Sequence, residues 1–159
     1  MTVVVGITAI AAAAMGGVFF AFSSFVMRAL GRMPAAQGMA AMQSINIVAV
    51  TPAFMTLFFG TALGCLVLAI DAVIYWQPAA GAFQLAGALC YLAGSFVVTI
   101  AANVPLNNSL AAADPQSDDG RRLWARYLRV WTAWNHLRAI ASLAGAGLLA
   151  LAGFEFAAP

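Results

Sequence analysis

The stretch that decides the fold is Trp131-Thr-Ala-Trp-Asn-His-Leu-Arg138-Ala-Ile-Ala-Ser-Leu-Ala-Gly-Ala-Gly-Leu-Leu-Ala-Leu-Ala-Gly-Phe154. Residues 139–154 are uncharged and apolar, but they are too few to cross a membrane. A helix rises about 1.5 Å per residue and needs about 20 residues to cross about 30 Å of hydrocarbon. The span must therefore include residues 131–138. Two tryptophans, the only histidine and an arginine consequently lie at a membrane boundary.

The rest of the chain is also poor in polar residues. Of its 159 residues, 64% are hydrophobic and 8% are charged, which leaves too little polar surface for a soluble domain. The sequence predicts an all-α integral membrane protein, a bundle of four transmembrane helices in one domain, with spans at about residues 2–27, 47–70, 81–103 and 131–154. A signal peptide is the alternative for residues 1–27, but the positively charged start is missing and the apolar run is too long.

The arginines predict the orientation of the spans. Arg28 and Arg32 follow the first span, and Arg121, Arg122, Arg126 and Arg129 lie between the third and the fourth. By the positive-inside rule, loops one and three are cytoplasmic and both termini lie outside the cell (inner) membrane. Arginines beside a membrane boundary indicate membrane lipid as a partner rather than nucleic acid.

Two loops have the pattern of short amphipathic helices. Pro34 can start a helix in which Met39, Met42 and Asn46 share one face. A copper thioether site is the alternative for the methionines, but helix packing is favoured because no histidine or cysteine lies nearby. Residues 121–130 alternate arginines with bulky apolar residues and predict a second amphipathic helix that leads into the fourth span.

Small residues in the second span predict close helix contact. Gly60 and Gly64 are four residues apart, a spacing that lets another helix approach. The partner helix belongs either to the same bundle or to a second copy in a homo-oligomer.

Polar side chains gather at the cytoplasmic ends of all four predicted spans. They are Ser23 and Ser24, Gln43 and Asn46, Asn103 and Asn107, and Asn135, His136 and Arg138. Within the fourth span, the spacing of Trp131, Asn135, Arg138 and Ser142 places them on one helical stripe, with His136 about 100° away from Asn135. Pro105 predicts a kink or a stop at the end of the third span.

Two interpretations of this polar vestibule remain open. Polar groups in a membrane segment are costly and usually face a cavity, which favours a small-molecule site. Alternatively, Arg138 reaches lipid phosphates, Trp131 and Trp134 belong to an aromatic belt, and the asparagines cap kinked helices. A lone histidine is more often hydrogen-bonded than metal-bound, so no metal site is predicted, and haem with two axial histidines would require two protomers.

Several of these motifs occur together in one known family. Asn103-Val-Pro-Leu-Asn107, followed by Trp131-x3-Asn135-x2-Arg138, with Phe25-Val-Met27 and Met42-Gln-Ser-Ile-Asn46 before them, resembles the anthrone oxygenase-like family of small four-helix membrane proteins. The resemblance covers nearly the whole chain. It implies oxidation of anthrones to anthraquinones and carries over to Asn103, Asn107, Trp131, Asn135 and Arg138.

Physical chemistry assigns a role to each candidate residue. An anthrone that loses a proton gives a delocalised carbanion, which can pass an electron to dioxygen without a cofactor; metal or haem remains the alternative. His136 is the candidate base, and Arg138 and Asn135 would stabilise the oxyanion. Substrate-binding residues would be Asn103, Asn107, Trp131, Trp134 and Asn46, for a flat hydrophobic molecule that arrives from the bilayer.

Competing functions use the same vestibule. The first is a non-enzymatic four-helix membrane protein that binds a lipid or quinone-like ligand, or a small partner subunit. A transporter is less favoured because no inverted repeat and no carboxylate in the middle of a span is found.

Overall fold

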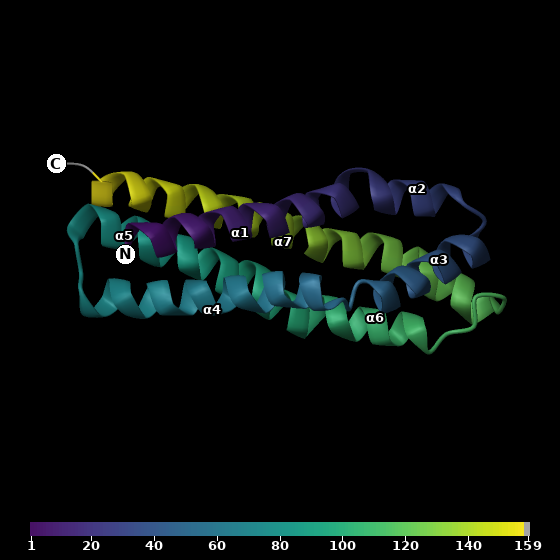
Figure 1. The fold of residues 1–159 in the computed structure, drawn as a ribbon. Coiled ribbons are helices and arrows are strands. Elements are labelled where there is room, and N and C mark those ends of the chain that lie inside the picture. Colours follow the sequence, from purple (N-terminus) through teal and green to yellow (C-terminus); the bar gives the residue numbers. More distant parts are fainter. Residues whose placement is uncertain (158–159) are drawn as a thin grey trace.

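Four long helices lie side by side and form an elongated bundle (Figure 1). The computed structural model describes residues 1–157, and within that range it contains helices and their connections but no strand. The first long helix comprises α1 (Thr2–Ala21), a π-helical segment (Phe22–Val26) and α2 (Met27–Arg32). The chain then turns back through α3 (Ala35–Val48) and the second long helix, α4 (Pro52–Ile74). The third long helix comprises α5 (Pro78–Tyr91), two π-helical segments (Leu92–Val97 and Thr99–Asn103) and α6 (Val104–Ala111). The fourth is α7 (Asp118–Ala157).

The four predicted spans are confirmed, since four helices are long and apolar enough to cross a membrane. Their bounds differ from those expected. The second span begins at Pro52 rather than residue 47, because Thr51 caps α4 by accepting a hydrogen bond from the Phe54 amide at 3.2 Å and Pro52 fits the first helical turn. Residues 47–48 belong to α3, and the third and fourth helices extend to residues 78–111 and 118–157.

Pro105 does not end the third long helix. It lies in the first turn of α6, directly after the π-helical Thr99–Asn103 segment. A proline in the first turn of an α-helical segment is tolerated because its N–H would have no α-helical partner there. The helix therefore passes the proline and carries Asn107 one turn beyond Asn103.

Glycines let α7 pack closely between α1 and α5. Gly87 of α5 lies against Gly145, where a Cβ would come within 2.9 Å of the Gly145 carbonyl oxygen, and Gly16 of α1 lies against Leu143. In α4, Gly64 faces Thr8 of α1, while Gly60 has nothing within 4 Å. Gly64 thus allows α4 and α1 to pack closely within the bundle.

Two apolar cores fill the bundle at different levels. One surrounds Met15, Leu68, Tyr91 and Leu149, and the other surrounds Met39, Met42, Trp124, Tyr127 and Trp131. The packing interpretation of the two methionines is thereby confirmed, as each is only 1% exposed. The predicted amphipathic lead-in is the first part of α7, continuous with the fourth span, and its aromatic side pairs with α3 in the second core.

Candidate functional site

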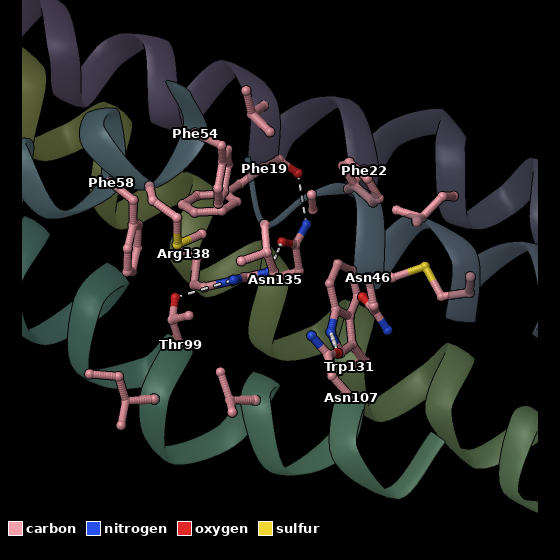
Figure 2. A pocket seen from close by; sticks show the side chains of 18 of the residues that line it. Phe19, Phe22, Asn46, Phe54, Phe58, Thr99, Asn107, Trp131, Asn135 and Arg138 are labelled. Carbon is pink, nitrogen blue, oxygen red and sulfur yellow. Dashed lines mark hydrogen bonds between the residues drawn. The ribbon is translucent and has the colours of Figure 1, made fainter. Parts of the chain in front are cut away.

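A partly open cavity of about 390 Å³ lies beside the connection between α3 and α4, and Figure 2 shows side chains that line it. This volume is within the range of small-molecule sites, about 300–1,000 Å³. Apolar side chains from α1, α3, α4 and the third long helix form most of its wall. The polar residues in the wall are few: Asn46, Thr99, Asn107, Asn135 and Arg138.

Among residues 1–157, Arg138 is the only charged residue in the cavity wall. It is 6% exposed, and its guanidinium donates to Thr99 Oγ1 at 3.2 Å and to Asn135 Oδ1 at 2.5 Å. Its Nε has no hydrogen-bond partner. No carboxylate pairs with it in residues 1–157, where the ion pairs join Arg121 to Asp118 and Arg122 to Asp119. A buried positive charge therefore faces an apolar cavity without a counter-ion.

Aromatic rings hold the guanidinium in place. Its central carbon lies 4.3 Å from the centroid of the Phe19 ring and 5.2 Å from that of Trp131. Both distances are within the range of cation–π attraction. Phe54 and Phe58, which also line the cavity, stack nearly parallel with centroids 6.3 Å apart. The cavity thus offers flat apolar surfaces beside one fixed cation.

Asn135 ties Arg138 to the first long helix. It is fully buried, and its Nδ2 donates to the Phe19 carbonyl oxygen and to Ser23 Oγ, both at 2.7 Å. Ser23 lies in the π-helical segment Phe22–Val26, a type of helix distortion that is common at functional sites. Because both Nδ2 donors are used, the Asn135 oxygen is left to accept from Arg138, and this fixes the amide orientation.

Asn103 and Asn107 make structural contacts with Trp131. Asn107 Oδ1 accepts hydrogen bonds from Trp131 Nε1 at 2.8 Å and from the Tyr127 hydroxyl at 2.7 Å. Asn103 Nδ2 donates to the Trp131 carbonyl oxygen at 3.3 Å. These contacts favour a supporting role for both asparagines. The two asparagines hold the backbone and the ring of Trp131, and this ring forms part of the cavity wall.

The structure brings five of the eight predicted site residues to the cavity: Asn46, Asn107, Trp131, Asn135 and Arg138. Asn103 is buried behind Trp131 and does not line the cavity. His136 and Trp134 are exposed on the outside of α7 and do not line it. The helical angle of about 100° per residue explains this, since neighbours of the buried Asn135 point elsewhere.

Sequence reasoning missed Thr99 and Phe19. Thr99 precedes Asn103 by one turn, so its place on the Asn103–Asn107 side of the helix was a usable signal. Phe19 contributes a ring to Arg138 and a backbone carbonyl to Asn135. The amino-acid type at position 19 does not indicate that its backbone carbonyl accepts a hydrogen bond from a distant side chain. Over residues 1–157, no group of three or more His, Cys, Asp or Glu side chains is arranged to hold a metal ion.

Fold and site together define a class of protein: a four-helix membrane bundle with a buried arginine at an apolar cavity. The family model described as anthrone oxygenase matches residues 52–148, more than half of the chain, and the chain therefore belongs to this family. The matched range contains Asn103, Asn107, Trp131, Asn135 and Arg138 but not Phe19 or Asn46. No curated protein and no solved structure matches the chain.

Proposed function

We propose that this protein oxidises a flat aromatic molecule of the anthrone or quinol type, using proton removal and dioxygen. The observation that carries the proposal is Arg138, a buried cation without a carboxylate partner that lines an apolar cavity. Family membership supports an oxygenase-like activity. The stacked Phe54 and Phe58 and the ring of Trp131 provide surfaces for a flat substrate.

A substrate that becomes negative during the reaction suits this site. Burying an arginine without a counter-ion is unfavourable, and an enolate oxygen in the cavity would supply the missing charge. The neutral substrate gains less from Arg138 than the enolate does. The guanidinium therefore stabilises the charge that develops in the transition state, which is how an enzyme lowers a barrier. Thr99 and Asn135 keep the guanidinium in place for this purpose.

For a substrate of the anthrone type, the proposed reaction converts a ring CH₂ to a carbonyl. Loss of one proton gives the enolate, which transfers an electron to O₂, and the two radicals join to form a carbon–oxygen bond. After protonation, loss of the remaining C–H proton with cleavage of the O–O bond gives the quinone carbonyl and water. The carbon loses four electrons and O₂ gains them. Because the delocalised carbanion itself reduces O₂, we propose a direct reaction without a metal or haem.

The first proton requires an acceptor. His136 was the candidate from sequence, but it does not line the cavity, and neither does any carboxylate. We propose instead that Arg138 lowers the pKa of the bound substrate, so that water at the cavity mouth accepts the proton. The guanidinium then makes the bound substrate more acidic, and His136 takes no part in the reaction.

We also propose an orientation in the membrane. Arg28, Arg32, Arg126 and Arg129 all lie toward the end of the bundle that contains α2 and the beginning of α7 (Figure 1). The positive-inside rule places this end, with loops one and three, in the cytoplasm of a cell with the protein in its inner membrane. Both termini would then lie outside, and the cavity would open near the cytoplasmic boundary.

The test is turnover of an added anthrone by purified protein, with O₂ uptake measured at the same time. Arg138→Gln should lower kcat by about 100-fold or more, the usual effect of removing an oxyanion stabiliser. Arg122→Gln, which changes an exposed arginine paired with Asp119, should leave turnover unchanged. Turnover by Arg138→Gln at the wild-type rate would refute the proposed role.

A non-enzymatic binding protein is the second candidate. The absence of an imidazole or carboxylate from the cavity wall favours it, because a binding site for a quinone-like or lipid ligand needs no base. Saturable binding of an anthraquinone with no O₂ uptake from the anthrone would select this function. Both candidates predict that Arg138→Gln weakens binding of an anionic aromatic ligand.

A further inference from the structure

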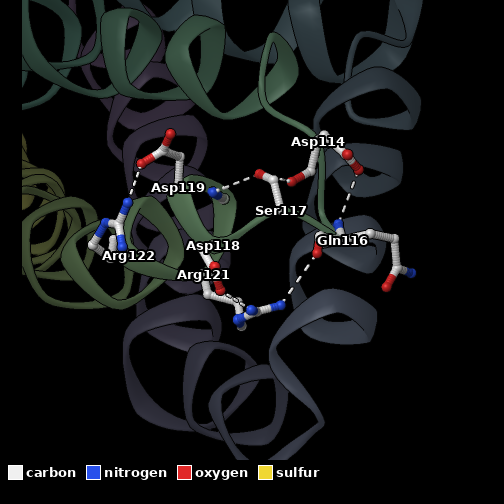
Figure 3. Close-up of polar contacts among 8 residues, drawn as sticks. Asp114, Gln116, Ser117, Asp118, Asp119, Arg121 and Arg122 are labelled. Atoms are coloured by element: carbon white, nitrogen blue, oxygen red, sulfur yellow. Dashed lines mark hydrogen bonds and ion pairs between the residues drawn. The ribbon is translucent and has the colours of Figure 1, made fainter.

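Four arginines of the bundle lie outside the cavity and have no ion-pair partner. Arg28 and Arg32 belong to α2, Arg126 and Arg129 belong to α7, and all four are exposed. Within residues 1–157 the ion pairs are made by Arg121 and Arg122, with Asp118 and Asp119 (Figure 3). The four unpaired arginines therefore carry a net charge that no side chain nearby neutralises.

The antiparallel register of the two helices brings these arginines to matching levels. Gly16 lies against Leu143 and Gly31 lies against Leu128, so the helices stay aligned over this length. The same alignment places Arg28 opposite Trp131, in the same turn as Arg129, and Arg32 opposite Tyr127, next to Arg126. The arginines thus form two pairs about one helical turn apart.

Helical geometry also places the four on one side of the α2–α7 pair. Gly31 and Leu128 mark the sides that face each other. At about 100° per residue, Arg28 and Arg32 lie about 60° and 100° beyond Gly31, and Arg129 and Arg126 lie about 100° and 160° beyond Leu128. Because the helices run in opposite directions, a positive rotation on each leads to the same side of the pair, with Arg126 at the far edge of that side, toward the back of α7. We call this surface the arginine face.

The exposed apolar surface of the bundle ends at this face. On α7, the exposed large apolar side chains begin at Trp134, which follows Arg129 in the next turns of the helix. On the first long helix they end at Phe25, three residues before Arg28, apart from Met33 in the following turn. Arg28 and Arg129 therefore stand at the level where the hydrocarbon ends. Lipid phosphates occupy that level in a bilayer.

We propose that the arginine face binds the headgroup of an anionic phospholipid. Charge complementarity identifies the ligand, since four unpaired guanidinium groups at the apolar boundary match a phosphate whose acyl chains continue over the apolar surface. A guanidinium can donate two parallel hydrogen bonds to one phosphate, and arginines at two neighbouring levels offer further donors to the same headgroup. This proposal does not depend on the function of the cavity.

The test is native mass spectrometry of the purified full chain, exchanged into detergent with phosphatidylglycerol or with phosphatidylcholine of the same acyl chains. We expect at least tenfold more retained phosphatidylglycerol than phosphatidylcholine, with the preference falling as ionic strength rises. The fourfold variant Arg28→Gln, Arg32→Gln, Arg126→Gln and Arg129→Gln should lose the preference. Its matched control, Arg121→Gln with Arg122→Gln, should keep it.

Two outcomes would overturn the proposal. One is a fourfold variant that still prefers phosphatidylglycerol, and the other is a control that loses the preference equally, which would show that net charge alone attracts the lipid. If the fourfold variant does not fold, the double variant Arg28→Gln with Arg129→Gln replaces it. That variant removes the level next to the hydrocarbon and should lower the preference at least threefold.

Discussion

The guanidinium of Arg138 donates a hydrogen bond to Asn135 Oδ1 across 2.5 Å, three residues earlier in the same helix. Asn135 in turn holds the first long helix through the Phe19 carbonyl and Ser23. The buried Asn135 amide thus contributes both to the packing of two helices and to the position of the charged Arg138 in the cavity wall. Changes at Asn135 should therefore affect both stability and the site.

Asn135→Ala should lower both the Tm and turnover, because it removes two hydrogen bonds to the first long helix and one to Arg138. Ser23→Ala removes only the hydroxyl partner and should lower the Tm less, with Arg138 still held. Steady-state kinetics with an added anthrone would separate these effects. We expect a fall in kcat for Asn135→Ala and a kcat near the wild-type value for Ser23→Ala. Equal kinetic losses in both variants would contradict the positioning role of Asn135.

His136→Ala should leave anthrone turnover within about twofold of wild type. The imidazole is exposed on α7 and does not line the cavity, so its removal changes no contact in the cavity wall. Comparison of kcat/KM with that of Arg138→Gln is the measurement, since 1.4 kcal/mol corresponds to about a tenfold change. A loss for His136→Ala as large as that for Arg138→Gln would restore histidine as the base.

Asn107→Leu should destabilise the bundle by about 1–3 kcal/mol. The substitution leaves the Tyr127 hydroxyl and Trp131 Nε1 without their acceptor, and a buried donor without a partner is costly. Thermal unfolding in detergent is the measurement. Tyr127→Phe provides the control, because it removes one of the two donors and should cost less. An unchanged Tm for Asn107→Leu would show that water replaces the amide.

Gly87→Ala should destabilise the contact between α5 and α7, by about 1–3 kcal/mol. Its Cβ would come within 2.9 Å of the Gly145 carbonyl oxygen and 2.9 Å of Leu149 Cγ, so the two helices must separate. Gly147→Ala is the matched control, because Gly147 has nothing within 4 Å and alanine is the better helix former. The Tm should fall for the first variant alone. Equal Tm values would mean that the helices move apart at little cost.

The stripe in the fourth span was the most accurate sequence prediction. Trp131, Asn135, Arg138 and Ser142 are all buried, as their spacing of i, i+4, i+7 and i+11 requires. The same rule of about 100° per residue could have placed His136 outside, and it was chemical reactivity that made the histidine a candidate. Helical periodicity predicted which side chains are buried better than chemical reactivity did, because the angular position of a residue on the helix determines its burial.

Other features could not be obtained from the sequence. Hydropathy started the second span at residue 47 because residues 47–50 are largely apolar, although Thr51 and Pro52 already carried a helix-start signal. The sequence patterns predicted none of the three π-helical segments within residues 1–157. The acceptor role of the Phe19 carbonyl depends on its neighbour in space, Asn135, which is more than 100 residues away in the chain.

The hydrogen bonds of Arg138 also bear on biogenesis. Phe19, Ser23 and Thr99, which hold the arginine directly or through Asn135, all precede it in the chain. During synthesis the first three spans are therefore made before the charged fourth span leaves the ribosome. The groups that hold the arginine are thus synthesised before it, and the cavity wall is complete only when the last helix packs against the others.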